Sequence, residues 1–179
     1  EIKKWWESES AHYQKESNIP IDIHYGPSSP NEKNLKLIGN VKGKKVLEIG
    51  CGGAQCSIAF AKQGAKVTAM DLSAEQLKFA KKLANKNNVK IEFIHGDIKD
   101  LSQIKSSSQD IVFSAFALHY VDDLLSCFNE VKRVLNKKGL FVFSLDHPFY
   151  RTIDWNNLKL KDSYFNTGRK EFTFSDHTK

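Results

Sequence analysis

Short apolar segments alternate with helical patterns through the middle of this chain, and this alternation restricts its fold more than any other feature. The apolar segments lie at residues 44–49, 65–71, 90–97, 110–116 and 140–146, and helical patterns separate them at residues 54–64, 73–88 and 122–139. Strands that are apolar throughout are buried on both faces, and alternation with helices is typical of a parallel sheet. We therefore predict an α/β fold: a doubly wound, Rossmann-like, mostly parallel sheet in three α/β/α layers, with five clear strands.

The composition argues against several classes of protein. Hydrophobic residues form 40% and charged residues 27% of the chain, which is ordinary for a soluble domain. No apolar run approaches the roughly 18 residues that a membrane span needs, and the charged start "EIKKWWESES" is no secretory signal. The three cysteines form no CxxC pair, so we interpret them as reduced thiols of a cytoplasmic protein.

The net charge of +6 raises the question of a nucleic-acid partner. Only three of the 27 basic residues are arginine, and the lysines are dispersed along the chain. Specific contacts to bases and phosphates favour the arginine fork, so the composition disfavours nucleic acid and leaves RNA binding as an alternative. The six histidines show no HExxH spacing, and we expect no metal site.

Three glycines follow the first strand within four positions, as Gly50, Gly52 and Gly53. Glycine permits a positive φ and lets a ligand touch the backbone, and ligands of open parallel sheets bind where the strands end. A phosphate-binding P-loop would need a GK[ST] sequence, which is absent. In a dinucleotide turn the third glycine would stand at Gln55, whose side chain would crowd the helix against the strand. The turn therefore predicts a ligand other than these two.

Acidic residues mark the carboxyl ends of the first three strands. Glu48 lies within the first strand, Asp71 ends the second and Asp97 ends the third. A buried carboxylate needs a cation or hydrogen-bond donors, and an acid at the end of the second strand is the usual partner of a ribose diol. A turn or capping role for each acid alone is an alternative. Together they indicate a ligand with an ammonium group, a ribose and an adenine, which describes S-adenosylmethionine.

At these positions the sequence resembles class I S-adenosylmethionine-dependent methyltransferases that act on small molecules. The matching segments are "EIGCGG" (48–53), "MDLS" (70–73), "GDI" (96–98), "FSAFALHYVDD" (113–123) and "VLNKKGLFVFS" (134–144). The resemblance covers about residues 40–147. It implies S-adenosylmethionine as cofactor, S-adenosylhomocysteine as product and a small-molecule methyl acceptor. The family often has a further glycine two residues after Gly52, where this chain has Ala54.

The resemblance also implies roles for particular residues. Gly50, Cys51 and Gly52 would offer backbone groups to the methionine end of the cofactor, and Glu48 would position that end. The adenosine end would be held by Asp71 at the ribose, with residues that pack on or bind the adenine: Leu72, Gly96, Asp97 and Ile98. The sulfonium side would be lined by Ala115 and Phe116, and an N-terminal loop that contains Tyr25 would cover the cofactor.

A hydroxyl or amine acceptor can require a base near the methyl group. His119 follows the fourth strand and His147 follows the fifth, so both are candidate catalytic residues; a structural role for His119 is equally open. A module that binds the cofactor without turnover and an RNA-directed methyltransferase are the alternative functions.

The chain divides into three regions in this interpretation. Residues 1–40 form an N-terminal helix and lid loop, residues 41–147 the Rossmann-like cofactor-binding core, and residues 148–179 a tail that begins an acceptor-binding or edge-strand region. The tail holds one further strand pattern, at residues 171–176, where the family has a helix and a hairpin. We therefore expect a fragment or a variant without the last hairpin, whose exposed fifth strand could pair in a dimer.

Overall fold

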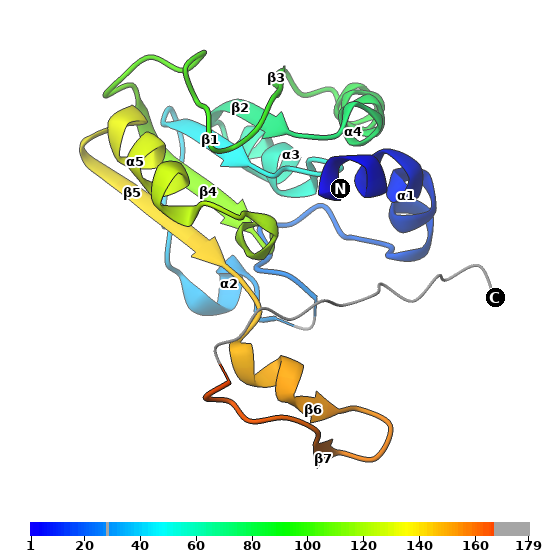
Figure 1. Cartoon of the computed structure of the whole chain (residues 1–179). Helices are drawn as coiled ribbons and strands as arrows, with labels where there is room; N and C mark the ends of the chain where they lie inside the picture. Colours follow the sequence, from blue (N-terminus) through cyan, green and yellow to red (C-terminus); the bar gives the residue numbers. More distant parts are fainter. Residues whose placement is uncertain (28, 167–179) are drawn as a thin grey trace. The chain divides into compact units, whose positions relative to one another are not determined.

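A computed structural model of the chain describes residues 1–27 and 29–166, apart from the side chain at position 151 (Figure 1). The chain divides into two compact units, residues 1–145 and residues 146–179. The first unit contains the sheet and all three clusters of buried apolar residues. We describe each unit by itself.

The first unit alternates strands and helices, as the sequence predicts. Its strands are β1 (Lys45–Ile49), β2 (Lys66–Asp71), β3 (Ile91–His95), β4 (Gln109–Ala115) and β5 (Leu135–Ser144). Its helices are α1 (Ile2–Glu16), α2 (Glu32–Leu35), α3 (Gln55–Lys62), α4 (Ala74–Lys86) and α5 (Leu124–Val134), with a short 3-10 helix, η1, at Leu118–Tyr120. None of the helices in the described residues is long and apolar enough to cross a membrane.

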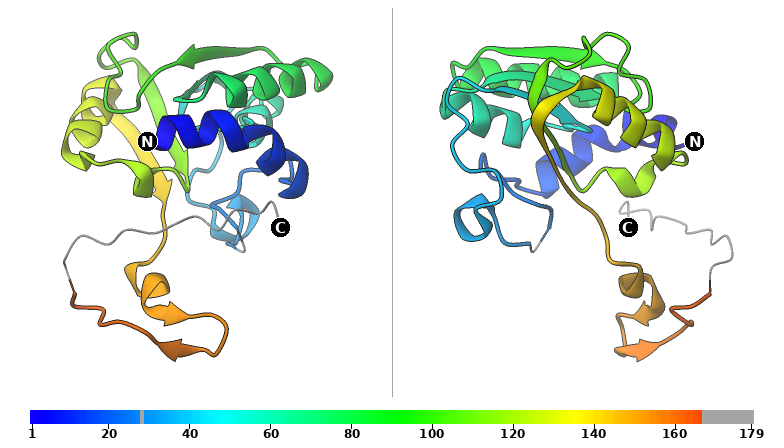
Figure 2. Two further views of the ribbon diagram at one scale, coloured as in Figure 1. Left: turned by 45° about the vertical axis from the view of Figure 1, so that its right-hand side comes forward. Right: turned by 90° about the vertical axis from the view of Figure 1, so that its left-hand side faces the viewer.

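The five strands form one parallel sheet in the order β3-β2-β1-β4-β5. Side chains of β1 alternate between the two faces: Val46 packs with Phe60 of α3, whereas Leu47 packs with Val131 of α5. Helix α4 joins α3 on the first face through Leu77. Helices therefore cover both faces of the sheet, as the two views of Figure 2 show, and the predicted doubly wound α/β fold is confirmed.

The boundary between α5 and β5 differs from the prediction. The helical pattern was expected to continue to Gly139, but α5 ends at Val134 and β5 begins at Leu135, which pairs with Gln109 of β4. Asn136 strengthens this pairing because its side chain donates to Asp110 at 2.6 Å. An added Cβ at Gly139 would lie 3.2 Å from the carbonyl oxygen of Gln109, so the close approach of the two strands uses this glycine.

The second unit holds secondary structure that the sequence analysis did not anticipate. A 3-10 helix, η2, spans Pro148–Thr152, and β6 (Ile153–Asp154) pairs antiparallel with β7 (Lys159–Leu160). The Asp154 carboxylate accepts hydrogen bonds from Asn156 and Asn157 inside the hairpin turn. The strand predicted at residues 171–176 lies outside the described residues.

Candidate functional site

The glycine turn after β1 is tightly packed at Gly50 and Gly53, where an added Cβ would clash with neighbouring side chains. Gly50 and Gly52 have φ values of +70° and +51°, a region that residues with a Cβ adopt only at a cost. A Cβ at Gly50 would lie 2.4 Å from the Cβ of Ala117, in the segment after β4. The turn therefore presents bare backbone next to the end of the neighbouring strand.

Glu48 is a buried acid in β1, two residues before Gly50. Its side chain accepts a hydrogen bond from the Ser57 hydroxyl of α3, and the residue is only 2% exposed. Burial raises the pKa of Glu48 to about 8, and the nearby Asp71 carboxylate adds to this increase. The carboxyl is thus placed where a cationic group of a ligand would stabilise its charged form.

Asp71 joins the glycine turn to the start of α4. One carboxylate oxygen accepts from the backbone N–H of Gly52 at 2.7 Å, and the other accepts from that of Ser73 at 2.9 Å. Burial raises the pKa of Asp71, and these backbone hydrogen bonds act in the opposite direction. A carboxylate has about four lone-pair sites, so the group can still accept a hydrogen bond from a ligand hydroxyl.

The third acid lies at the same edge of the sheet but in a more open setting. The backbone N–H of Gly96 donates to the Asp71 carbonyl at 3.0 Å, which fixes the end of β3 beside the end of β2. The Asp97 carboxylate accepts from the Lys99 backbone, and the Lys99 ammonium lies 3.7 Å from it. Ile98 is buried in the core, and the Leu72 carbonyl contacts a ring nitrogen of His95 at 3.0 Å.

The segment after β4 borders the same edge of the sheet, on the side of β1 that faces away from β2. Ala115 ends the strand, and Phe116 adopts a φ of +57°, which is unusual for a bulky residue. The Phe116 N–H donates to both the carbonyl and the hydroxyl oxygen of Ser144, at 3.2 and 3.1 Å. A Cβ at Gly26 would lie 2.7 Å from the Phe116 ring. The N-terminal loop therefore reaches the same place.

The two histidine candidates have different surroundings. His119 lies in η1, with its ring centroid 4.8 Å from that of Phe116 and 4.2 Å from that of Tyr120. His147 belongs to the second unit, where its Nδ1 accepts from the Phe149 N–H and its ring stacks on Tyr164. Among the candidates, the structure brings His119 to the edge described here, and the catalytic role of both residues stays a prediction.

Tyr25 lies in the hydrophobic core rather than on an exposed lid. It is 4% exposed, its ring packs edge-on against Phe113, and its hydroxyl donates to Glu32 at 2.5 Å. Burial raises its pKa, and the hydrogen bond to Glu32 raises it further. The neighbouring Gly26, and not Tyr25, lies against Phe116. A contact of Tyr25 with the cofactor stays a prediction.

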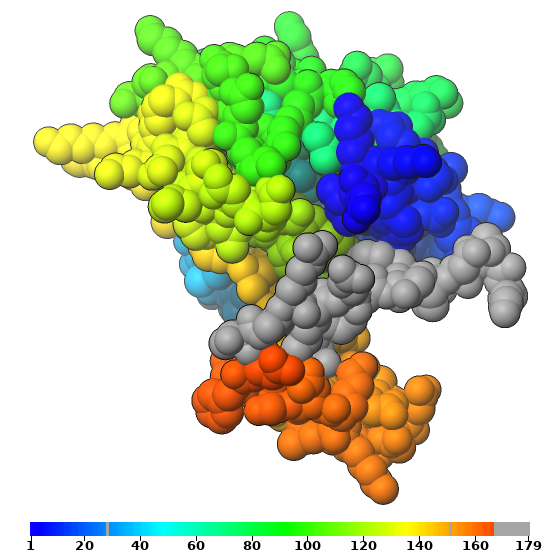
Figure 3. All heavy atoms as spheres, viewed as in Figure 1, coloured from blue at the N-terminus to red at the C-terminus, as the bar shows by residue number. Residues whose placement is uncertain are grey.

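Helix α1, the predicted N-terminal helix, lies along the start of α4 (Figure 1), and this packing was not predicted from the sequence. Glu7 accepts from the backbone N–H groups of Ala74 and Glu75, at 2.8 and 3.3 Å, and so caps α4. The Ser10 hydroxyl lies 3.3 Å from that of Ser73. Figure 3 shows the atoms of α1, in blue, beside the green atoms of later segments of the same unit.

Gln14 of α1 lies directly against the glycine turn. It donates to Gln76 at 2.8 Å and accepts from Gln55 at 2.7 Å, and it is 8% exposed. A Cβ at Gly53 would lie 2.5 Å from the Gln14 oxygen. Polar residues on an otherwise charged helix give no periodic apolar signal, so only the run of aromatic residues marked α1 as an element that packs on the core.

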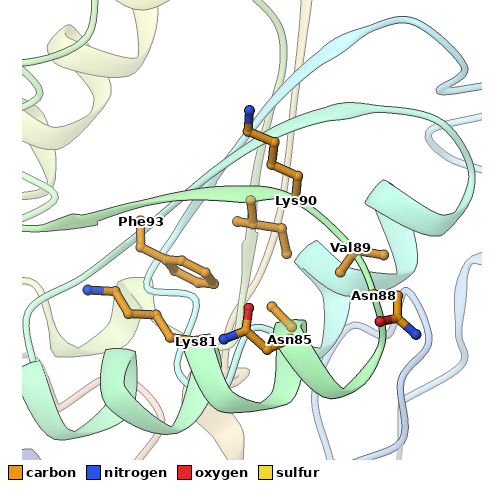
Figure 4. Close-up of a pocket in the computed structure, with 8 residues that line it drawn as sticks. Lys81, Asn85, Asn88, Val89, Lys90 and Phe93 are labelled. Carbon is orange, nitrogen blue, oxygen red and sulfur yellow. The ribbon is translucent and has the colours of Figure 1, made fainter.

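Two hollows in the described surface lie elsewhere. One, of about 710 Å³, is lined by residues of α4 and the start of β3, including Lys81, Asn85 and Phe93 (Figure 4). The other, of about 540 Å³, lies beside Lys44 and Asp110, at the amino-terminal ends of β1 and β4. Neither contains any residue of the glycine turn or any of the three acids. No group of three or more His, Cys, Asp or Glu residues among the described residues is arranged to hold a metal ion.

Comparisons with known proteins agree on one family. A family model described as "Methyltransferase domain" matches residues 47–143. An uncharacterized protein of Haemophilus influenzae is 31% identical over 140 residues, and a ubiquinone biosynthesis O-methyltransferase of Actinobacillus pleuropneumoniae is 30% identical over 144 residues. These alignments cover 76% and 78% of this chain, but 54% and 58% of the two relatives. The chain thus spans little more than half the length of the relatives that it matches.

A solved structure gives the same result for the fold. The S-adenosylmethionine-dependent methyltransferase of Mesorhizobium loti superposes with a TM-score of 0.61 at 30% identity. The superposition covers 66% of this chain and 54% of that protein. Residues 47–143, which the family model matches, include the glycine turn and the three acids.

Proposed function

We propose a methyl-transfer reaction for this chain, which belongs to the family of S-adenosylmethionine-dependent methyltransferases. Its cofactor is S-adenosylmethionine, as the motifs at the strand ends indicated. The proposed acceptor is a small molecule, and the names of the Actinobacillus and Vibrio relatives, which are O-methyltransferases, favour a hydroxyl group as the site of methylation.

The residues at the carboxyl end of the sheet fit this cofactor. Glu48 is a buried carboxyl that a ligand ammonium group would help to ionise. Asp71 is held by the backbone N–H groups of Gly52 and Ser73 and would accept from the ribose with its remaining lone pairs. At Gly52 an added Cβ would meet no atom closer than 3.8 Å, so the bare backbone there can approach the methionine end. The proposal rests mainly on one observation. Two adjacent strands, β1 and β2, bring together Glu48, the glycine turn and Asp71.

The remaining roles follow from position. Asp97, with Leu72 and Ile98, would hold the adenine, because these residues follow β2 and β3 at the same edge as Asp71. Ala115 and Phe116 would border the sulfonium side, because Ala115 ends β4 and Phe116 follows it next to the glycine turn. The cofactor supplies an activated methyl group on a sulfonium.

The protein then needs to orient the acceptor and exclude water. An acceptor held in line with the methyl group at roughly 3–3.5 Å gains much of the rate from orientation alone. A hydroxyl acceptor also releases a proton, which a base near the methyl group would take. His119 follows β4 in η1, with its ring beside that of Phe116, so we assign this role to it within the proposal. Cys51, Cys56 and Cys127 are all free and buried, and the cytoplasmic location expected from them stays a prediction.

Calorimetric titration with S-adenosylhomocysteine tests the proposal. Wild type is expected to bind, and Asp71→Ala is expected to weaken binding by roughly 10- to 100-fold, since it removes hydrogen bonds to a charged acceptor. Glu92→Ala is the matched control, because Glu92 is an exposed acid within β3 and not at its end. Equal affinity of Asp71→Ala and wild type would refute the proposed site. Binding without methylation of any hydroxyl acceptor would instead favour a silent cofactor-binding module.

A further inference from the structure

Residues 96–108 join β3 to β4 and carry Asp97, the acid assigned to the adenine. The Asp97 side chain is 44% exposed, so burial does not fix its direction. Its carboxylate accepts a hydrogen bond from the backbone N–H of Lys99, and its carbonyl accepts from that of Asp100 at 2.9 Å. Both contacts lie within one turn. The direction of the carboxylate therefore depends on how the backbone of this turn is held.

Two side chains of α5 hold the backbone directly after the turn. The Leu101 N–H donates to the Glu130 carboxylate at 2.9 Å, and the Leu101 carbonyl accepts from the Arg133 guanidinium at 2.7 Å. Arg133 also donates to the Ile104 carbonyl at 2.9 Å and to the Ser106 hydroxyl at 3.1 Å. We call Glu130 and Arg133 the clip, because together they bind several polar groups of one segment.

The clip is paired within itself. Two nitrogens of the Arg133 guanidinium donate to the two carboxylate oxygens of Glu130, each at 2.7 Å. A bidentate pair of this kind fixes the orientation of both side chains. Both are half-buried, and the hydrogen bond from Arg133 lowers the pKa of Glu130, so the carboxylate stays charged at neutral pH. The clip is therefore a rigid, ionised support for Leu101.

Attachment of the segment to the core does not by itself account for the clip. The Leu101 and Ile104 side chains are buried in the core. The N–H groups of Ser107 and Ser108 donate to the last two carbonyls of α5, at 2.9 and 2.8 Å. Apolar packing and these contacts already attach the segment to the core and to α5. What the clip adds is a fixed backbone orientation at Leu101, close to the turn.

We propose that the clip positions the cofactor: by holding Leu101 it fixes the turn that aims the Asp97 carboxylate at the exocyclic amino group of adenine. The inference rests on the proposed function, which places the adenine at Asp97. The hydrogen bond from Gly96 to the Asp71 carbonyl holds the other end of the turn. Hydrogen bonds weaken steeply when they are misaligned, so loss of the clip costs selectivity for the amino group more than binding in general.

The test is a calorimetric comparison of S-adenosylhomocysteine with its purine analogue, in which hydrogen replaces the exocyclic amino group. Wild type is expected to prefer S-adenosylhomocysteine by roughly tenfold or more, because a hydrogen bond to a charged acceptor is strong. Arg133→Met keeps the apolar stem and removes every donor. It is expected to reduce this preference to about threefold, through weaker binding of S-adenosylhomocysteine, with the affinity for the analogue within about twofold of wild type.

Lys132→Met is the matched control, because Lys132 is the exposed neighbour of Arg133 on α5 and its replacement removes the same charge. This variant is expected to keep the wild-type preference. Glu130→Gln is the second test variant, since it weakens the pair but keeps an acceptor for Leu101. It is expected to reduce the preference by about threefold, and it decides the question if thermal unfolding shows that Arg133→Met does not fold.

Equal loss of affinity for both ligands would show that the clip only maintains the fold, and an unchanged preference in the folded variants would show that it does not act on Asp97. Either result would overturn the proposal. Equal binding of the two ligands by wild type would also overturn it, because Asp97 would then not hold the amino group. Failure of wild type to bind S-adenosylhomocysteine at all would overturn the proposed function instead.

Discussion

Glu48 illustrates how a single buried acid couples the pH to the stability of this fold. Its pKa is raised to about 8 because burial disfavours the charged carboxylate. The unfolded chain releases this proton near pH 4.5. Between these values the folded state binds more protons than the unfolded state, so the free energy of unfolding must fall as the pH rises.

We predict that Glu48→Gln removes this decrease in the free energy of unfolding with rising pH. The amide keeps the shape of the side chain and does not titrate. Without cofactor, the stability of the variant relative to wild type is expected to increase between about pH 4.5 and 8, by roughly 1 kcal/mol per pH unit. Urea denaturation of both proteins at pH 5, 6, 7 and 8 measures the difference. A constant difference across this range would show that Glu48 ionises normally in the folded protein.

Single residues also mark the limit of what the sequence predicts here. Glu48, Asp71 and Asp97 were found because the parallel-sheet pattern places the ends of strands at one edge. Gln14 could not be found in this way, since no pattern relates a glutamine in the first helix to a glycine turn 39 residues later. Such contacts depend on how α1 packs on α4, and this packing is polar and not periodic.

At the scale of elements, α1 is attached mainly through hydrogen bonds. Its fully buried residues are Ser10 and Gln14, and Glu7 caps α4 from outside. Its apolar contacts are made by Trp5, Trp6 and Tyr13, none of which is fully buried. The free energy of local opening should be well below that of global unfolding.

We predict that Glu7→Gln increases hydrogen exchange in α1 by roughly two- to fivefold, because it removes a negative charge at the N-terminus of α4. Amides of β1 and β4 are expected to keep their wild-type exchange rates. Glu16→Gln is the control, since Glu16 is exposed and has only a weak ion pair with Lys15. Unchanged exchange in α1 would show that its aromatic contacts, and not the cap, hold it in place.

The boundary of α5 shows why elements are predicted better than their ends. Leu124, Phe128, Val131 and Leu135 share one helical face in the sequence, so the helix was expected to continue to Gly139. Leu135 instead enters β5, because its backbone pairs with Gln109. A pairing partner 26 residues earlier in the chain is not visible to a local pattern. The five predicted strands were confirmed at their places along the chain, because each strand is marked by its own apolar composition.

At the scale of the whole molecule, the stability of the fold is concentrated in the first unit. The three clusters of buried apolar residues draw on residues from Ile23 to Val142, and none of their members lies beyond residue 145. The second unit consists, in its described part, of η2 and a two-stranded hairpin with mostly exposed side chains. An isolated two-stranded hairpin is marginally stable in water.

We therefore predict that residues 1–145 fold by themselves and bind S-adenosylhomocysteine with the affinity of the full chain. The reason is that burial of apolar surface dominates stability, and the acids and the glycine turn all lie within this unit. Thermal unfolding and calorimetric titration of the two proteins measure this, with truncation after residue 134 as the control, which removes β5 and should abolish cooperative unfolding. A large loss of cofactor affinity with unchanged cooperativity would assign part of the binding site to the second unit, and would direct attention to His147 as the residue there with catalytic chemistry.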